Sequence, residues 1–390
     1  MTPSSMTLLG ARCWDGDAWI DAPIHLQGGL VVERPARDGV VVDLRDQDAT
    51  ILPGLVDAHT HLGIPPLHPN AAGMTDVALD DVMMQSARIH IKAGVTTVRD
   101  LGELRGRNHV WAERQHASDW TGPRIVQYGT PLTVTDGHCA WMGHACDGPD
   151  AADQAARREL ELGADGVKLM VSGGLSSQGT DARGLLMDAA SIQAACNVAR
   201  NRSAPVAAHV MGGPGLQTAA RMGVTSIEHG YWMSREDADV MAAHGVMWVP
   251  TMTVPWLVAE RVPFGDATPS EAMAQLAREA REAQHASMQH ALAAGLHIVA
   301  GTDYAPGTLA DEIRLMSEAG VPTDDALRAA TSSAAKLLRL ADVGHLRTGA
   351  HADVLVVQGD PRRDMRVLTR PMMVIRGGVV VHDERANATA

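Results

Sequence analysis

The segment ILPGLVDAHTH, residues 51–61, is an apolar run that ends in a His-x-His pair. Strands that are apolar along most of their length are typical of a parallel sheet whose outer face is covered. Eight such strands, each followed by a helix, predict an α/β fold of the (β/α)8 TIM-barrel type. The seven runs that follow the first one, separated by longer helical patterns, span residues 94–102, 124–132, 166–174, 204–210, 225–230, 246–252 and 297–304.

Both ends of the chain differ from this middle part. Residues 6 to about 50 and 345–383 consist of short strand-like pieces with turns and carry no convincing helical pattern. Neither piece is long enough to form a stable sheet domain alone. We therefore expect the two termini to pair into one small composite β-domain, residues 1–54 plus 345–390, beside a barrel of residues 55–344.

Several polar residues mark where the helices of the middle part should begin. Asp150, Ser234 and Thr323 are expected N-caps, because a side-chain oxygen there accepts a hydrogen bond from a backbone N–H of the first turn. The segment TPSE, residues 268–271, has the pattern of a capping box with proline at the first helical position.

Composition limits the class of protein. Of the 390 residues, 45% are hydrophobic and 20% are charged, and the formal net charge is −13. These fractions exclude disorder, collagen and coiled coil, and the negative charge makes nucleic acids and anionic membranes poor partners. The sequence shows neither the roughly 20 apolar residues of a membrane helix nor a secretory signal. We expect a cytoplasmic protein that acts on a small molecule; a homo-oligomer is left open.

The cysteines do not indicate a disulfide framework, because they are four in number and form no CxxC pair. Cys139 and Cys146 lie close to His138 and His144 in the sequence. This run is able to bind a metal, but its spacing fits neither a zinc ribbon nor a zinc finger.

The His-x-His pair at the end of the first run carries the strongest chemical signal. Residues i and i+2 of a strand point to the same side, so His59 and His61 project together toward the barrel axis. Two imidazoles placed in this way can bind one metal ion. Two ordinary histidines are the alternative, because this short pattern is common by chance.

Three further polar residues end predicted strands. His209 ends APVAAH, His229 ends TSIEH and Asp303 ends HIVAGTD. A TIM barrel places its active site at the C-terminal tips of its strands. A single buried histidine is usually a hydrogen-bonded core residue, but four histidines and an aspartate that converge on one barrel mouth favour a metal site.

Lys168 lies in the apolar strand GVKLMV, where an unpaired ammonium group would be costly to bury. A cationic lysine also cannot bind a metal ion. Reaction of the amine with carbon dioxide would give an anionic carbamate, whose two oxygens can bridge two metal ions about 3.5–4 Å apart. The alternative is a lysine that pairs with a carboxylate.

Together the motifs ILPGLVDAHTH, GVTTVRDLG, GADGVKLMVSGG, SIEHG, GTDY and GHLRTGAHADVLVV resemble the amidohydrolase superfamily. The resemblance covers about residues 7–382 and is greatest to the branch of imidazolonepropionase-like enzymes and bacterial Xaa-Pro dipeptidases, which are prolidase-like. It implies two divalent metal ions, usually zinc. The first would be bound by His59, His61, Asp303 and carbamylated Lys168, and the second by the same carbamate, His209 and His229.

One departure from the wider superfamily bears on the reaction. The deaminase-type members have a single metal and a glutamate three residues after the strand-five histidine, where this chain has Gly212. The presence of Lys168 and the absence of that glutamate favour hydrolysis at an amide-type carbon.

The expected function is hydrolysis of an amide or peptide C–N bond in a dipeptide or N-acyl amino acid. Bridging by two metals lowers the pKa of a water from 15.7 to about 7 or lower, so that a metal-bridging hydroxide attacks at neutral pH. Asp303 would accept its proton and deliver it to the leaving amine. Tyr231 and His138 are candidate donors to the developing oxyanion, and Arg183 is a candidate for binding a substrate carboxylate; each is otherwise a loop residue without a direct role.

Two other functions are weighed against this one. Within enzymes, the alternative is a hydrolase of a cyclic amide, such as a lactam or imidazolone, or a deaminase of a small heterocycle. A non-enzymatic scaffold of the same fold would be marked by the loss of metal ligands. All six expected ligands are present in this sequence, so a scaffold is disfavoured.

Overall fold

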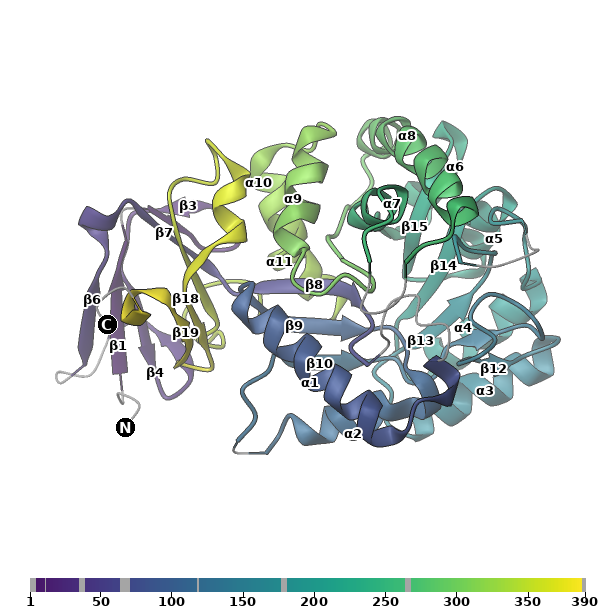
Figure 1. Ribbon diagram of the computed structural model, residues 1–390, viewed down its shortest axis with the longest axis horizontal. Helices are drawn as coiled ribbons and strands as arrows, with labels where there is room; N and C mark the ends of the chain where they lie inside the picture. Colours follow the sequence, from purple (N-terminus) through teal and green to yellow (C-terminus); the bar gives the residue numbers. More distant parts are fainter. Residues whose placement is uncertain are drawn as a thin grey trace.

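A computed structural model describes residues 5–10, 12–34, 39–63, 71–117, 119–176, 181–263 and 268–387. Figure 1 shows two parts: a barrel of strands with helices around it, and a β-domain in which the first and last segments of the chain lie side by side. The predicted (β/α)8 barrel with a composite β-domain from both termini is therefore confirmed.

Eight parallel segments close the barrel. The last of them, residues 297–303, makes the isolated pairings Trp248–Ile298 and Thr60–Asp303 with its neighbours instead of a regular ladder. The others are β8 (Leu55–Thr60), β9 (Val95–Asp100), β10 (Arg124–Gln127) with its continuation β11 (Leu132–Thr133), β13 (Val167–Met170), β14 (Val206–Gly212), β15 (Ser226–Trp232) and β16 (Met247–Val249). A short strand, β12 (His144–Ala145), pairs with β11.

Helices follow these strands in turn and cover the outside of the barrel (Figure 1). They are α1 (Asp76–Lys92), α2 (Arg107–Arg114), α3 (Pro149–Glu161), α4 (Ala189–Asn201), α5 (Pro214–Met222), α6 (Arg235–Ala243), α7 (Thr253–Ala259), α8 (Glu271–Ala294), α9 (Leu309–Glu318), α10 (Thr323–Ala329) and α11 (Ser332–Leu337).

Alternate residues of the barrel strands divide between two apolar layers. In β14, Ala208 and Val210 pack in the cluster between strands and helices, whereas Ala207 packs in the cluster inside the barrel. Because side chains alternate along a strand, the apolar runs of the sequence serve both layers at once. This explains why the runs lack the polar alternation of a half-exposed sheet.

The β-domain contains two sheets. The four-stranded sheet has the order β5-β4-β1-β6, and the six-stranded sheet has the order β19-β18-β17-β7-β2-β3. Their strands are β1 (Ser5–Leu9), β2 (Arg12–Trp14), β3 (Trp19–Ile20), β4 (Ile24–Gln27), β5 (Leu30–Val32), β6 (Val40–Asp43), β7 (Ala49–Pro53), β17 (Val354–Gln358), β18 (Pro371–Arg376) and β19 (Val379–Asp383).

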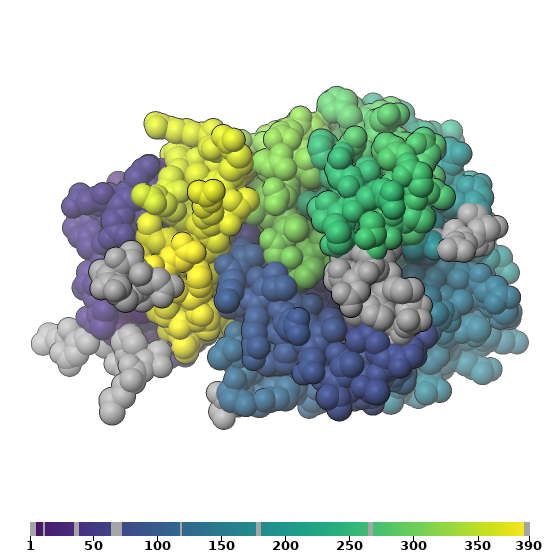
Figure 2. Space-filling model, viewed as in Figure 1, coloured from purple at the N-terminus to yellow at the C-terminus, as the bar shows by residue number. Residues whose placement is uncertain are grey.

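The antiparallel pair β7–β17, with Leu52 opposite Leu355, joins the two termini within one sheet. Figure 2 shows the C-terminal segment, in yellow, lying against the N-terminal segment, in purple. The domain boundaries at residues 54 and 345 stay a prediction.

We predicted one strand over residues 51–61, but the structure has two. The chain leaves the terminal sheet at Pro53 and enters the barrel at Leu55. Gly54 makes the junction, and a Cβ added there would lie 2.2 Å from the Thr96 side chain. Only glycine therefore allows this close approach.

Two other predicted strands are interrupted. The segment 124–132 breaks after Gln127 and pairs again from Leu132, with Gly129 at φ +63° between the two parts. The segment 297–304 runs along its neighbours without a regular ladder. Its backbone is nevertheless tied to β8, since Ala58 N donates to Ala300 O at 3.0 Å.

One of the predicted N-caps is confirmed and the others are displaced. Ser234 caps α6 in a capping box with Asp237. Helix α8 begins at Glu271 with Ser270 as its N-cap, two residues later than predicted. Asp150 lies in the first turn of α3, behind the cap residue Gly148, and Thr323 is the first residue of α10, behind Pro322. Proline marks the start of both helices, as the first residue of α3 and as the cap residue of α10.

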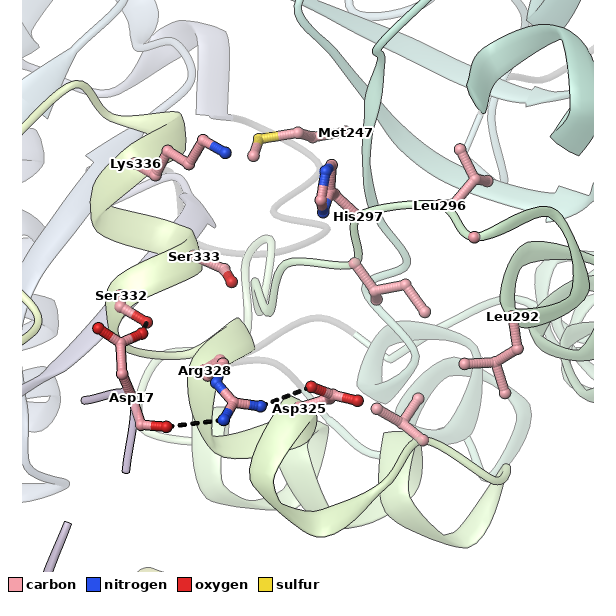
Figure 3. A pocket seen from close by; sticks show the side chains of 13 residues that line it. Asp17, Met247, Leu292, Leu296, His297, Asp325, Arg328, Ser332, Ser333 and Lys336 are labelled. Carbon is pink, nitrogen blue, oxygen red and sulfur yellow. Dashed lines mark hydrogen bonds and ion pairs between the residues drawn. The ribbon is translucent and has the colours of Figure 1, made fainter. Parts of the chain in front are cut away.

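A cavity of about 590 Å³ opens at the N-terminal ends of the last barrel strands, where Met247 and His297 lie (Figure 3). Its wall also includes Lys336, and Arg328, which donates to Asp325 at 2.7 Å and to Asp17 O at 2.6 Å. None of the predicted metal ligands is among the lining residues that the structure describes. Across the described ranges, no helix combines the length and apolar character that a membrane crossing requires.

Candidate metal centre

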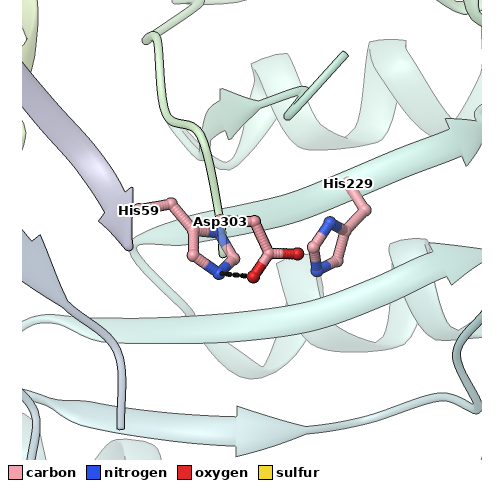
Figure 4. Close-up of side chains that lie close together, drawn as sticks. All are labelled: His59, His229 and Asp303. Atoms are coloured by element: carbon pink, nitrogen blue, oxygen red, sulfur yellow. Dashed lines mark ion pairs between the residues drawn. The ribbon is translucent and has the colours of Figure 1, made fainter. Parts of the chain in front are cut away.

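The structure brings the strand-end residues together at the C-terminal mouth of the barrel. The possible ligand atoms of His59, His229 and Asp303 all lie within 4.8 Å of one another, and Asp303 stands between the two rings in Figure 4. His61 Nε2 and His59 Nε2 each lie 3.5 Å from Asp303 Oδ1. The His209 ring lies 4.5 Å from that of His229. We call these five residues the mouth cluster.

Three residues at the mouth have backbone angles that side chains rarely adopt. The φ angles are +74° at His229, +59° at Asp303 and +46° at Thr251. A non-glycine residue in this region carries backbone strain, which persists where the surrounding structure imposes it and often marks functional sites.

Each ring of the mouth cluster has one nitrogen bound by the protein. His59 Nδ1 lies 2.9 Å from Glu228 Oε2, and His61 Nδ1 lies 2.8 Å from Gly102 O. His229 Nδ1 lies 2.8 Å from Thr251 Oγ1, and His209 Nε2 lies 2.8 Å from Gly173 O.

Three of these contacts assign the tautomer of the ring. A carbonyl or carboxylate oxygen only accepts, so the nitrogen that faces it carries the proton. The other nitrogen of these rings is left with its lone pair: Nε2 of His59 and His61, and Nδ1 of His209. The Thr251 hydroxyl both donates and accepts, so its contact with Nδ1 does not fix the tautomer of His229. Metal-binding histidines in proteins are held in this way through their second nitrogen, so the donor set fits divalent metal ions.

Burial keeps these imidazoles neutral. It lowers the pKa of His59, His209 and His229 well below the usual value of 6.5, and neighbouring positive groups lower it further. Neutral imidazole is the form that binds a metal ion. Burial also raises the pKa of Asp303, although His61 and Lys168 oppose this shift.

Lys168 lies in β13 with 1% of its surface exposed, on the inner side of the barrel. Burial lowers the pKa of its amine to about 8, and the charges of Glu228 and Asp303 only partly oppose this. The neutral form of the amine is therefore more populated near physiological pH than at the ordinary pKa of 10.5, although it is still the minority.

His138 also reaches the mouth cluster. Its ring stacks on that of His209 at 4.2 Å between centroids and 23° between planes. Burial and the charge of Lys168 lower its pKa to about 3, so the ring is neutral. A Cβ added at Gly174 would lie 2.3 Å from this ring, so the loop after β13 needs glycine there.

Tyr231 and Arg183 occupy different surroundings. The Tyr231 hydroxyl is buried, 2.9 Å from Thr251 Oγ1 and 3.4 Å from His229 Nδ1. Arg183 is exposed, and its guanidinium lies 5.5 Å above the Trp232 ring. The substrate roles of His138, Tyr231 and Arg183 stay predictions.

Sequence reasoning missed the residues whose hydrogen bonds position the mouth cluster. Asp57 accepts hydrogen bonds from the backbone of His59 and Thr302 at 3.1 Å each, and from Thr302 Oγ1 at 2.5 Å. Glu228 and Thr251 bind the rings of His59 and His229, as described above. Asp57 and Glu228 had a signal, because each is an acidic residue inside a predicted apolar strand, as Lys168 is a basic one.

Comparison with known proteins identifies the chain. Residues 50–381 match the sequence model of the Amidohydrolase family. The protein belongs to the amidohydrolase family. Family membership and hydrolase relatives show an enzyme that acts on C–N bonds, as predicted. The family generally binds divalent metals, and the His59–His229–Asp303 group of this amidohydrolase is able to hold one.

Three relatives cover most of the amidohydrolase chain. Ochratoxinase of Aspergillus niger is 27% identical over 359 residues, covering 83% of this chain and 73% of its own. An imidazolonepropionase of Salinispora arenicola is 25% identical over 383 residues, covering 86% of each chain. The crystal structure of a Xaa-Pro dipeptidase with bound methionine in its active site superposes with a TM-score of 0.87 at 27% identity, covering 97% of this chain and 99% of that one. The predicted prolidase-like and imidazolonepropionase-like resemblance is confirmed.

Proposed function

We propose that this amidohydrolase cleaves the amide or peptide C–N bond of a dipeptide or N-acyl amino acid with two divalent metal ions, most simply Zn2+. The convergence of four histidine rings with Asp303 at the mouth carries the proposal. His59, His61 and Asp303 would bind the first ion, and His209 and His229 the second. The cytoplasmic location and a homo-oligomer stay predictions.

Carbamylated Lys168 would bridge the two ions. The neutral amine is the form that reacts with carbon dioxide, and the pKa of about 8 makes it available. Conversion of the amine to a carbamate also replaces a positive charge that would repel the metals with a negative one. Lys168 is thereby the sixth ligand.

Metal ions bound there would supply a water of lowered pKa and would polarise the scissile carbonyl. Asp303 lies among the ligand nitrogens, so its carboxylate is in place to accept the proton of the attacking water. The same carboxyl group then returns the proton to the departing nitrogen, which must leave as a neutral amine.

The neutral ring of His138 is suited to bind the carbonyl oxygen. A neutral imidazole N–H donates a hydrogen bond to the developing oxyanion without losing its proton. Tyr231 supports the same step, either directly or by holding His229 through Thr251. Arg183, stacked on Trp232, offers a guanidinium to the carboxylate of the substrate.

A second candidate is hydrolysis of a cyclic amide. The imidazolonepropionase relative, aligned over 86% of both chains, favours it. The same mouth cluster would serve this reaction, because a ring C–N bond next to a carbonyl is opened by the same attack. Deamination of a heterocycle is the weaker variant, since Gly212 stands where deaminases have a glutamate.

The test combines elemental analysis with a substrate library. We expect two metal equivalents per chain and loss of activity after chelation, restored by zinc. The library contains Xaa-Pro dipeptides, other Xaa-Xaa dipeptides and N-acyl amino acids, with lactams and imidazolones as the competing class. Each acyl amino acid is paired with its amide, which lacks the free carboxylate. Turnover of the cyclic compounds alone would show that the substrate is a cyclic amide and not a dipeptide or N-acyl amino acid. Full activity of metal-free protein would refute the mechanism.

A further inference from the structure

We infer that Glu228 is a positioning residue that orients His59 for the metal and fixes its tautomer, and that Arg99 and Ser226 hold Glu228 in turn. Glu228 is not among the six predicted ligands. The inference rests on the proposed metal site, because it assigns a function to a contact behind that site.

The contact between Glu228 and His59 has the geometry of a strong hydrogen bond. His59 Nδ1 donates to Glu228 Oε2 at 2.9 Å, and both side chains are buried, with exposures of 1% and 0%. With Nδ1 protonated, Nε2 keeps its lone pair and points to Asp303 Oδ1 at 3.5 Å. A carboxylate acceptor also makes the imidazole a stronger electron donor to a metal.

The second oxygen of Glu228 is held equally firmly. Its Oε1 accepts from Arg99 Nη2 at 2.9 Å and from Ser226 Oγ at 2.5 Å. Arg99 is fully buried and also donates to Ser226 Oγ and to Ala58 O. Ala58 precedes His59 in β8. The network therefore holds both the ring of His59, through Glu228, and the backbone next to it, through Arg99.

The backbone of β15 explains why both Glu228 and His229 take part. Alternation along a strand places neighbouring side chains on opposite faces, and Ser226 and Glu228 accordingly share the inner face. His229 would then point outward. Its φ of +74° breaks the alternation, so that its ring lies 5.2 Å from that of His59. The strain at His229 thus keeps a metal ligand and a positioning carboxylate on consecutive residues.

The competing explanation is a purely structural ion pair. Arg99 and Glu228 then stabilise the barrel interior, and the contact with His59 is incidental. Removing one partner of a buried pair destabilises a protein in either case. Stability alone therefore does not distinguish the explanations, whereas metal affinity does.

The first experiment compares Glu228→Gln with Glu159→Gln, both as zinc-loaded protein. Glu159 is a matched control, because it is a buried carboxylate that accepts hydrogen bonds from two histidines, His109 and His144, which lie outside the mouth cluster. Competition with a chromogenic chelator gives the zinc dissociation constants. We expect Glu228→Gln to weaken one zinc by about 10- to 100-fold, and Glu159→Gln to leave both unchanged.

A double variant separates the loss of the carboxylate acceptor from the change in net charge. In Glu228→Gln, Arg99 is left as an unpaired buried cation near the metals. The variant Arg99→Gln/Glu228→Gln restores neutrality but not the carboxylate acceptor. We expect zinc binding to remain weak in the double variant. Recovery of wild-type affinity would show that only charge balance matters, and would overturn the inference.

A measurement on the unmodified protein keeps the inference testable if the variants fold poorly. In zinc-loaded protein with 15N-labelled histidine, NMR should show a downfield Nδ1–H proton for His59, assigned by its loss in His59→Asn. A proton on Nε2 instead would refute the assignment of the tautomer. Wild-type protein that binds no zinc would refute the proposed function itself, whereas normal zinc binding by Glu228→Gln would refute only the role of Glu228.

Discussion

The mouth cluster differs instructively from a second group of histidines and a carboxylate, on the barrel wall. This wall cluster consists of Glu159 from α3, His109 from α2 and His144 from β12. His109 Nε2 lies 3.1 Å from Glu159 Oε2, and His144 Nε2 lies 2.8 Å from Glu159 Oε1. Histidines and a carboxylate thus lie together at two places in the barrel, once around Glu159 and once around Asp303.

The difference lies in what the ring nitrogens face. In the wall cluster both Nε2 atoms are bound to one carboxylate. Burial raises the pKa of Glu159, but hydrogen bonds from His109, His144 and the backbone of Thr130 outweigh it and lower the pKa to about 2. In the mouth cluster the protein binds the second nitrogen of each ring and leaves the first directed at a common space. Convergence of lone pairs, rather than proximity of histidines to acids, distinguishes a metal centre.

The largest expected effect separates the two clusters directly. His209→Asn should remove a ligand of the second metal and lower kcat/KM by at least about 10³-fold, because a metal contributes several kcal/mol to the transition state. His144→Asn should leave metal content and rate unchanged and lower only thermal stability. Elemental analysis, steady-state kinetics and thermal unfolding of both variants provide the check. Equal loss of metal in both would make the distinction between the clusters wrong.

The next effect concerns Lys168, the proposed bridging ligand. Lys168→Ala should lower the rate by about 10³-fold through loss of the bridging ligand. Acetate or propionate added with zinc should restore part of the rate by replacing the carbamate. Lys336→Ala is the control, because Lys336 lines the cavity at the other end of the barrel and should leave the rate unchanged. A bare Lys168 amine in the crystal structure of the active, zinc-loaded enzyme would contradict the assignment.

A smaller effect is expected at the neutral ring that stacks on His209. His138→Asn should lower kcat by about 10²-fold, the usual cost of losing one oxyanion donor. Metal content should stay at two equivalents, because His138 is not a predicted ligand. A loss of zinc that matches the loss of rate would instead make His138 part of the metal site.

The sequence contained enough to predict the fold and the convergence at the mouth. Apolar runs served both layers of the barrel, and His59, His209 and His229 stood at or near strand ends, which a TIM barrel gathers at one mouth. The breaks at Gly54 and Gly129 were not predicted, because they depend on contacts with distant segments. The approach of Gly54 to Thr96, for example, is a tertiary contact.

The network behind the mouth cluster was missed for a related reason. Glu228 and Arg99 are 129 residues apart in the chain, so the sequence around either residue does not indicate that the two form a pair. Side chains also alternate along a strand. A prediction that places His229 on the inner face of β15 therefore places Glu228 on the outer face. The positive φ of His229 overrides that rule, and no local residue pattern announces it. Charged residues inside apolar strands are the signal that was available, and it was used only for Lys168.

The smallest effect tests the structural character of the wall cluster. Glu159→Gln should lower the free energy of unfolding at pH 7 by about 1–3 kcal/mol, because a buried charge-assisted contact is weakened. The pKa of Glu159 is lower in the folded protein, about 2, than its ordinary value of 4.5. Its stabilisation is therefore fully present above pH 4.5 and is lost as the pH falls toward 2.

The stability difference between wild type and Glu159→Gln should accordingly shrink below pH 4.5, by about 1.4 kcal/mol per pH unit. Urea unfolding of both proteins at pH 7, 5, 4 and 3.5 measures it, and any loss of metal in acid affects both equally and cancels in the difference. The zinc affinity at pH 7 should be the same in both proteins. A constant stability difference across this range would mean that Glu159 is not held as a carboxylate by His109 and His144. A weaker zinc site in the variant would mean that the wall cluster and the mouth cluster are coupled.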